Sequence, residues 1–592
     1  MTRMKQARVR QVGSPVAMLA ALAATGAVMA MPAVAQAQSI GGDSMGGGAG
    51  SGMGGSDANA SDGSLRKSDR SSRRGGRGQG GKRIEIAPYI EIDQVVTAQL
   101  SPGSDVLTYT QAAVGVDASI QGRNNGLAAS VRYQRQFGWG RKAGDGDAIS
   151  GLVRGYATVL PGVTVEAGGL ASQVDVENGG AALAAGTLSG NGKSTVYSVY
   201  AGPSVQTRAG DLDVAANYRA GFTKVDQSNS ARDAQTGAAA DVFDKSVTQM
   251  ADVQAGFAPG TVLPVGVGAA GSFYQEDISN LDQRARDMQA RAMVTVPVSR
   301  TVQVVGAIGY EDVEISSRDA VRDADGNPVI GSDGRYVTDK SSPRELAYDV
   351  SGLIWDVAVM WRPSRRTSLS AHVGRRYGST SFGGTLAYAP NDRSQFSVSV
   401  YDNVSGFGGQ LNRALDQLPD DFEVVRDPVT GELRGCVSSL ESGNCLSGVL
   451  GSVRSSTFRA RGIAANYSMQ IGRLSAGIGA GYDRRKYIAA AGTVLASANG
   501  VIDENWWLAA YLSGDLGRDA GWSANVYANW ISSDDALTGD VAGYGASASV
   551  YKNFMPRLRG TLAVALNGQQ YKAPAIDDLW TASALAGLRY SF

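Results

Sequence analysis

The chain has 592 residues, of which 78 are glycine, and its 55 Lys and Arg balance its 55 Asp and Glu. It contains 1 His and 2 Cys, which excludes a conventional zinc site. After the N-terminal region no apolar run reaches the ~18 residues of a membrane-spanning helix, so helical spanning is excluded as well.

Residues 1–37 have the features of a secretory signal peptide. A basic segment precedes an apolar run at 16–34, and residues 33–37 contain two small-x-small patterns for cleavage. No cysteine lies near the cleavage site to carry a lipid. The exported chain is therefore expected to enter a membrane by its own fold.

Residues 38–83 are rich in Gly and Ser and then turn basic, and we expect them to be disordered because they have almost no large apolar side chains. Two roles stay open for this tail. It is a flexible spacer, or its cations attract acidic polysaccharide or peptidoglycan. An exported tail meets no nucleic acid. The basic N-terminal region leaves the rest of the chain with a net charge of about −8.

From Ile84 onward one unit repeats. Each unit is a segment in which apolar and polar residues alternate, and the segments are joined alternately by a tight turn and by a longer polar loop. Ten short turns between eleven hairpins predict about 22 strands, within a range of 20 to 24, and place both ends of the barrel on one side. The fold class predicted for 84–592 is all-β, a transmembrane antiparallel up-and-down β-barrel. Its longest extracellular loops are expected at about 316–344 and 406–456.

Alternate residues separate an apolar face from a polar one. In 522–530, for example, Trp522, Val526 and Trp530 alternate with small or polar residues. The alternation alone also suits a soluble sandwich, but some 500 residues of one repeat favour a single closed sheet. Arg135 does not fit this alternation, because it would face lipid unless the strand bulges or has left the hydrocarbon there.

The last segment, 580–592, carries apolar residues at every second position, with aromatic residues at both ends of that face. Leu588, Tyr590 and Phe592 resemble the C-terminal signal that the barrel-assembly machinery reads in outer-membrane barrels. The resemblance implies the outer membrane of a Gram-negative cell, with outer-membrane lipid as the surroundings. The tail and the C-terminus would be periplasmic.

No catalytic, cofactor or metal site is expected. His372 lies in the polar phase of its segment, and no local motif couples it to a nucleophile, so we interpret it as an ordinary lumen-facing histidine. The segment 323–327 has carboxylates at a calcium-like spacing, but Gly334 stands where a bidentate Glu is needed. A surface turn is the favoured interpretation.

Cys436 and Cys445 lie in the longest loop, and in an exported chain we expect them to form a disulfide. The segment 427–431, Asp-Pro-Val-Thr-Gly, is a turn signal. It predicts a hairpin standing above the membrane.

Charged residues in the polar phases are candidates for the pore wall, where they would set selectivity for polar solutes or sugars. They could equally be paired only to make the wall soluble. The candidates are Arg132, Arg219, Asp287, Arg291, Arg376, Asp483 and Arg485.

The stretch 374–390, GRRYGSTSFGGTLAYAP, and the SVSVYD that follows resemble the beta-barrel porin-2 type of outer-membrane protein. That type is common beside exopolysaccharide genes in alphaproteobacteria. Similar chains sometimes carry the name preprotein translocase accessory subunit, which describes a single-span helix that this chain lacks. The resemblance implies a porin or an export-associated barrel.

Two classes of function compete. One is a channel for polar solutes or saccharides, narrowed if the loop 406–456 folds inward. The other is a non-conducting structural or adhesive barrel that acts through its loops. Active uptake is disfavoured, because about 45 residues before the first strand cannot form a plug of ~100 residues or more.

Overall fold

The structure is a computed structural model. It describes residues 83–592 except for nine short gaps, at 141–142, 177–181, 185–192, 228–241, 419–421, 439–443, 446, 536–538 and 573–576. The predicted signal peptide and all but the last residue of the predicted tail lie outside the described residues.

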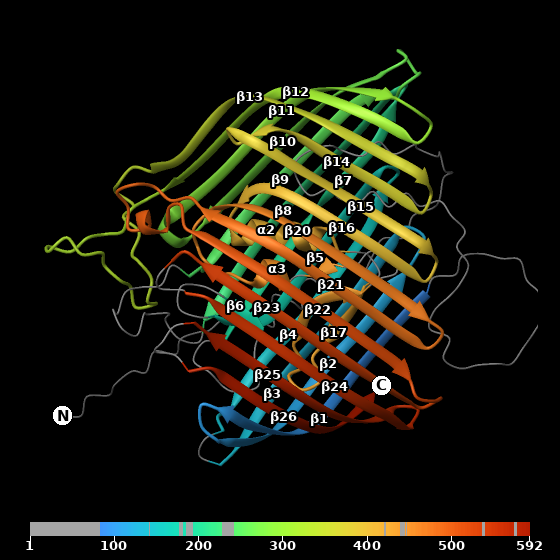
Figure 1. Cartoon of the computed structure of the whole chain (residues 1–592), viewed down its shortest axis with the longest axis vertical. Helices are drawn as coiled ribbons and strands as arrows, with labels where there is room; N and C mark the ends of the chain where they lie inside the picture. The colour runs from blue at the N-terminus through green and yellow to red at the C-terminus, as the bar shows by residue number, and fades with distance from the viewer. Residues whose placement is uncertain are drawn as a thin grey trace, which may run out of the picture. The chain divides into compact units, whose positions relative to one another are not determined.

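A single antiparallel sheet closes on itself (Figure 1). It has 23 strands, of which the short β6 (Ala182–Ala184) pairs with the end of β5 outside the ring, so 22 strands form the barrel. Each barrel strand pairs with its neighbours along the chain. The predicted fold class and strand count are therefore confirmed.

The barrel strands are 10 to 20 residues long, which suits strands that cross a bilayer at a tilt. Their bounds are β1 (Arg83–Ser101), β2 (Val106–Gln121), β3 (Asn125–Trp139), β4 (Gly146–Leu160), β5 (Val163–Val176), β7 (Lys193–Ala209), β8 (Leu212–Gln227), β9 (Lys245–Phe257), β10 (Gly266–Ile278), β11 (Gln283–Pro297), β12 (Val302–Ser317), β13 (Glu345–Ser364), β14 (Thr367–Arg376), β15 (Ser379–Asn391), β16 (Ser394–Ser405), β20 (Phe458–Ile471), β21 (Leu474–Tyr487), β22 (Ile502–Asp515), β23 (Ala520–Ser533), β24 (Val541–Met555), β25 (Leu558–Tyr571) and β26 (Leu579–Ser591).

The outer surface of the barrel is apolar and the inner surface is polar. Trp506 and Val526, for example, are 56% and 49% exposed on the outside, while their neighbours Asn505 and Tyr527 face inward. Such a belt of exposed large apolar residues suits contact with lipid and not with water. This belt makes the closed sheet a transmembrane barrel of the outer-membrane type.

Arg135 does lie on the outer face, as its position in the alternation predicted. Its guanidinium nitrogens lie 3.9 Å from Asp145 and 3.6 Å from Asp147, beside the loop that joins β3 to β4. The side chain is 42% exposed at the end of the strand. It is therefore paired at the rim of the barrel, where the strand reaches the loop.

Tight turns join the strands on the side where the chain ends. Three of them place glycine at positive φ, where it avoids the strain that a Cβ would cause: Gly162 at 79°, Gly210 at 62° and Gly472 at 62°. The longer connections lie on the opposite side. Among the described residues, no helix is long and apolar enough to span a membrane.

The ring closes between β1 and β26, with Tyr89 opposite Ser591 and Ser101 opposite Trp580. At the end of this seam where the chain ends, the Phe592 N–H donates a 3.0 Å hydrogen bond to the Pro88 carbonyl oxygen. The Phe592 ring packs edge-on against the Tyr590 ring, 5.2 Å between centroids. Phe592 thus contacts both strands that must meet for the barrel to close.

Deleting Phe592 should lower the heat-modifiable, folded fraction of the protein in the outer membrane. The deletion removes the last seam hydrogen bond and the apolar ring that resembles the assembly signal. The matched variant Phe592→Tyr keeps both and should fold like the wild type. An unchanged folded fraction after the deletion would reject the predicted role of Phe592.

The loop between β12 and β13, residues 318–344, forms an irregular hairpin through isolated bridges such as Ala320 with Thr338 and Ile330 with Tyr336. Its base packs with Leu281, which lies in the short 3-10 helix η2 (Asn280–Asp282), and with Leu495, which precedes the 3-10 helix η3 (Ala496–Ala498). This loop extends beyond the ends of the strands (Figure 1). Its extracellular location stays a prediction.

The other long loop, residues 406–456, is called here the lumen strap. It contains α2 (Phe407–Asp416), α3 (Ser447–Leu450) and a separate small sheet of β17 (Glu423–Arg426), β18 (Leu433–Ser438) and β19 (Asn444–Cys445). Its buried residues pack with inward-facing residues of the barrel. The expectation that 406–456 is an extracellular loop is therefore corrected: apolar and hydrogen-bonding partners on the wall hold it inside the barrel, an arrangement that its length had left open.

Candidate functional site

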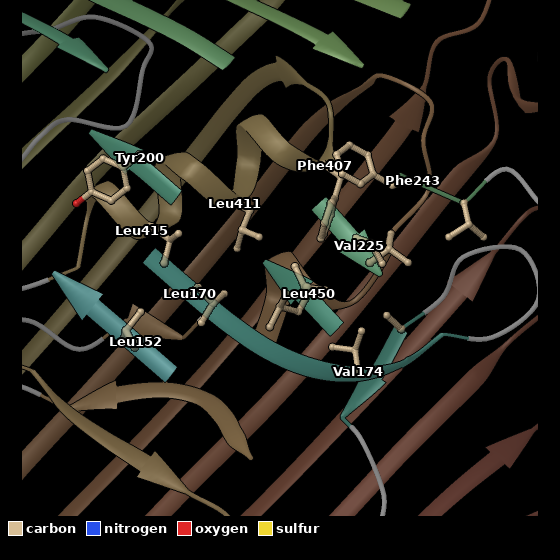
Figure 2. Packing of buried hydrophobic residues seen from close by; sticks show 14 of the residues in the cluster. Leu152, Leu170, Val174, Tyr200, Val225, Phe243, Phe407, Leu411, Leu415 and Leu450 are labelled. Atoms are coloured by element: carbon tan, nitrogen blue, oxygen red, sulfur yellow. The ribbon is translucent and has the colours of Figure 1, made fainter. Parts of the chain in front are cut away.

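An apolar seat holds α2 against the inner wall. Phe407, Leu411 and Leu415 of the helix pack on inward-facing residues of β4, β5 and β8 and on Phe243, whose ring lies 5.1 Å from that of Phe407 (Figure 2). All three helix side chains are at most 1% exposed. Burial of this kind stabilises by roughly 1.5 to 3 kcal/mol per side chain, so the docked helix is a stable part of the barrel.

A wall carboxylate caps the N-terminus of α2. Glu276 of β10 is fully buried and accepts hydrogen bonds from the backbone N–H of Gly406 at 2.7 Å and of Gly409 at 3.0 Å. The Tyr274 hydroxyl donates a third at 2.6 Å. Because helix N-termini leave N–H groups unpaired and favour negative charge, Glu276 both satisfies and anchors this end of the strap.

The rest of α2 is held by polar groups of three further strands. The Asn412 amide donates to the hydroxyl of Thr248 at 2.9 Å and accepts from that of Ser198 at 3.0 Å. At the end of the helix, Asp416 accepts from Arg219 of β8 at 2.8 Å. Arg219 also pairs with Glu166 of β5 at 2.8 Å, so this ion pair joins the strap to two wall strands.

The turn 427–431 lies inside the barrel, and the prediction of a hairpin above the membrane is wrong. Gln134 donates to the Thr430 carbonyl oxygen at 3.0 Å, and Val429 is buried among inward-facing residues of β1, β2, β25 and β26. Arg426 donates to Ser150 at 2.7 Å. The turn signal was correct, but a turn satisfied by wall donors and an apolar contact is more stable inside than in water.

The far end of the strap is tied to the opposite part of the wall. Arg485 of β21 donates to the carbonyl oxygens of Ser452 at 2.8 Å and Val449 at 3.0 Å. Arg454 of the strap pairs with Asp503 at 3.2 Å and Asp535 at 3.0 Å. The strap is thus anchored to strands on several sides of the lumen and crosses it.

Two ionisable groups of the strap are perturbed by this packing. Burial raises the pKa of Glu432 to about 7, although the Gln173 N–H donates to its carboxylate at 3.2 Å. Burial lowers the pKa of Arg426. For a carboxyl whose pKa is raised on folding, the protonated form favours the folded arrangement. Ionisation of Glu432 as the pH rises through about 7 therefore weakens docking of the strap.

All seven predicted pore-wall charges face inward, and all are at most 8% exposed. Arg376 joins Asp287 at 2.7 Å and Glu311 at 3.3 Å, and Arg291 pairs with Asp356 at 2.8 Å. Arg132, Arg219 and the pair of Asp483 with Arg485 form three further groups. Arg132 pairs with Glu91 at 2.7 Å, and Asp483 with Arg485 at 2.7 Å. The charges therefore neutralise one another along the wall and hold the strap, and a role in selectivity stays a prediction.

The remaining candidates, His372 and the segment 323–327, have local structural contacts. His372 is on the inner face of β14 and lies over Gly383, since a Cβ on that glycine would collide with the imidazole. The Asp323 carboxylate accepts the N–H of Asn327 at 2.8 Å, which lowers its pKa and closes a local turn. Within the described ranges no group of three or more His, Cys, Asp or Glu is placed to hold a metal ion.

Cys436 and Cys445 lie directly opposite each other, in the register between β18 and β19. This pairing of their backbones suits the predicted disulfide. Mass mapping without reductant should find the two cysteine peptides linked. Two alkylatable thiols in protein isolated from the envelope would refute the disulfide.

The sequence patterns did not single out Glu276 and Asn412, which anchor α2. Glu276 stands at an inward position of its strand, whereas Asn412 lies in a segment expected to be a loop. The partner of each lies more than 100 positions away along the chain. In the sequence, Glu276 is a carboxylate in the polar phase of its segment. The helix that it caps was expected to be part of a loop. The only local signal was the parity of its position.

No protein-family model matches the chain, and no curated protein matches it. The resemblance to the beta-barrel porin-2 type is therefore not supported by a family model. Solved structures with a similar barrel include the FrpB iron transporter of Neisseria meningitidis, at 10% identity and a TM-score of 0.41, over 86% of this chain and 81% of that one. At this distance the likeness concerns the fold alone.

Two further neighbours are of the same kind. The ferric-catecholate import receptor Fiu of E. coli K12 has 11% identity and a TM-score of 0.40, over 85% of this chain and 81% of that one. The siderophore receptor PirA of Acinetobacter baumannii has 10% identity and a TM-score of 0.37, over 85% and 80%. Neither bears on what this barrel carries.

Proposed function

We propose that the chain is an outer-membrane channel for small polar solutes, and that the lumen strap sets which solutes pass. The observation that carries this proposal is the strap itself, anchored through Glu276 at one end and Arg485 at the other. A barrel of ~22 strands encloses a space wide enough for water unless something fills it. A fixed loop across that space limits passage by size.

The chemistry of the wall supports a wet lumen. Inward positions carry paired charges, amides and hydroxyls, groups that are costly to leave in a dry interior without partners. The strap docks unevenly, because α2 packs on β5, β7, β8 and β9. A polar face beyond that seat, such as that of β23 and β24, favours a channel over a solid structural barrel.

Saccharide passage stays part of the proposal, whereas an extended polysaccharide would need the strap to leave the lumen. The alternative is a non-conducting adhesive or structural barrel that acts through loops such as 318–344. No reaction is assigned to the chain. The tail 38–83 keeps its two proposed roles, spacer or tether to acidic polymer.

Electrical recording in planar bilayers tests the channel against this alternative. The purified, folded protein should give discrete conductance steps at a low level per molecule. Folding is checked beforehand by heat modifiability. Folded protein that adds no conductance to the bilayer would contradict the channel and favour the structural or adhesive barrel.

A further inference from the structure

One part of the inner wall carries aromatic rings and amides in place of charges. Between Asp503 and Asp515, the inward positions of β22 are Asn505, Trp507, Ala509, Tyr511 and Ser513. On β23 the inward positions from 521 to 533 are also uncharged. These positions are assigned to the inner face because the intervening residues, such as Trp506 and Val526, are exposed on the outer face. This uncharged surface on β22 and β23 is called here the aromatic track.

The strand register arranges rings and amides in alternation. Trp507 lies opposite Asn529, and Tyr511 lies opposite Asn525. Between them Tyr527 of β23 lies opposite Ala509. Trp507 and Tyr511 are four residues apart on β22, about 13 Å along the strand, and the Tyr527 ring on the next strand is set between them. Every ring therefore has an amide side chain on the same face within one or two positions.

Glycine on the neighbouring strand lets these rings lie against the wall. A Cβ on Gly477 would collide with the Tyr511 ring, one on Gly545 with the Tyr527 ring, and one on Gly481 with the indole of Trp507. Each ring thus covers a glycine with one face. The Tyr511 and Tyr527 side chains are partly exposed on the inner side of the wall. Trp507 is 5% exposed, at the end of the track toward α3.

We propose that the aromatic track binds neutral oligosaccharides during their passage. This inference rests on the proposed channel function and names its substrate class. The apolar C–H face of a pyranose ring fits a flat aromatic ring, and the hydroxyls at its edge match amides, which both donate and accept. Between Asp503 and Asp515 the inward face of β22 carries no charged side chain. An ionic solute therefore finds no oppositely charged partner there.

The location of the track agrees with that role. The seat of α2 is on β5 to β9, and the turn 427–431 contacts residues of β1, β2, β3, β25 and β26. These two strap-bound surfaces lie on other strands. On β22 the strap meets the end of the track, where Arg454 pairs with Asp503 and α3 lies beside the strand. A solute that passes the strap meets the rings in sequence along β22 and β23.

The same ring-over-glycine packing also occurs outside the track and supplies a matched control. A Cβ on Gly126 would collide with Tyr156, which lies on the inner face of β4. If such rings only stabilise the sheet, Tyr156→Leu and Tyr511→Leu should have equal effects. If the track binds sugar, only the second kind of change should alter binding.

The test compares the wild type, the double variant Tyr511→Leu/Tyr527→Leu and Tyr156→Leu, each as full-length protein. Maltohexaose is titrated by calorimetry in detergent and by block of the ion current in bilayers, with hexagalacturonate as the charged counterpart. We expect maltohexaose to bind the wild type and Tyr156→Leu alike. Its dissociation constant should rise at least about 10-fold in the double variant, and hexagalacturonate should bind none of the three.

The two readouts separate the track from the channel. Calorimetric binding that the double variant loses, in a protein that does not conduct, would retain the track and contradict the channel. Conductance without maltohexaose binding would retain the channel and contradict the track. Equal loss in Tyr156→Leu, or tighter binding of hexagalacturonate, would overturn the track.

Discussion

Replacing residues 409–451 by a Gly-Ser link should raise the single-channel conductance several-fold. The deletion removes most of α2, the turn 427–431 and α3, and so clears the groups that now cross the lumen. Conductance follows the water-filled cross-section, and in a barrel of ~22 strands that cross-section is wide once nothing fills it. Recording in planar bilayers, after heat modifiability has shown folding, measures the change.

A control for this experiment is a shortened outer loop. Replacing residues 323–333 by a Gly-Ser link removes the tip of the hairpin in 318–344, which lies outside the wall. That variant should conduct like the wild type. If the protein conducts neither before nor after removal of the strap, the channel is contradicted and the adhesive or structural barrel takes its place.

Glu276→Ala should release the N-terminal end of the strap while the barrel stays folded. The change removes a carboxylate that accepts from Gly406, Gly409 and Tyr274. The bonds from Gly406 and Gly409 are the two that join the strap to the wall. At about 1.5 to 3 kcal/mol for each bond to a charged group, their loss shifts the docking equilibrium by a hundredfold or more. We expect rapid trypsin cleavage after Arg413 and Arg426, and frequent transitions to a higher conductance.

Two further variants make this result specific. Glu276→Gln keeps the size of the side chain and one acceptor oxygen, and should be cleaved at an intermediate rate. Glu504→Ala removes a carboxylate of the outer face, which pairs with Tyr482 there, and should leave the strap protected. Protection of the strap in folded Glu276→Ala equal to that in the wild type would show that Glu276 is not the anchor.

The barrel could be predicted because its determinants are local. Period-two alternation assigns each residue to one face, and short turns count the hairpins, so the strand number and the parity of Arg132 or Asp287 follow from neighbours in sequence. The same parity placed all seven charged candidates on the inner face. It could not tell which residues pair, because Arg376 meets Asp287 across 89 positions.

What lies inside the barrel was decided by tertiary structure. The segment 427–431 codes for a turn, yet whether a turn stands in water or among Gln134 and Val95 depends on contacts with distant strands. Glu276 likewise becomes a helix cap only because Gly406 is brought to it over 130 residues. Alternation and turn residues act over a few positions, and therefore determined the wall by themselves. The position of the strap depends on burial of apolar and hydrogen-bonding groups from separate segments, which only the folded chain brings together.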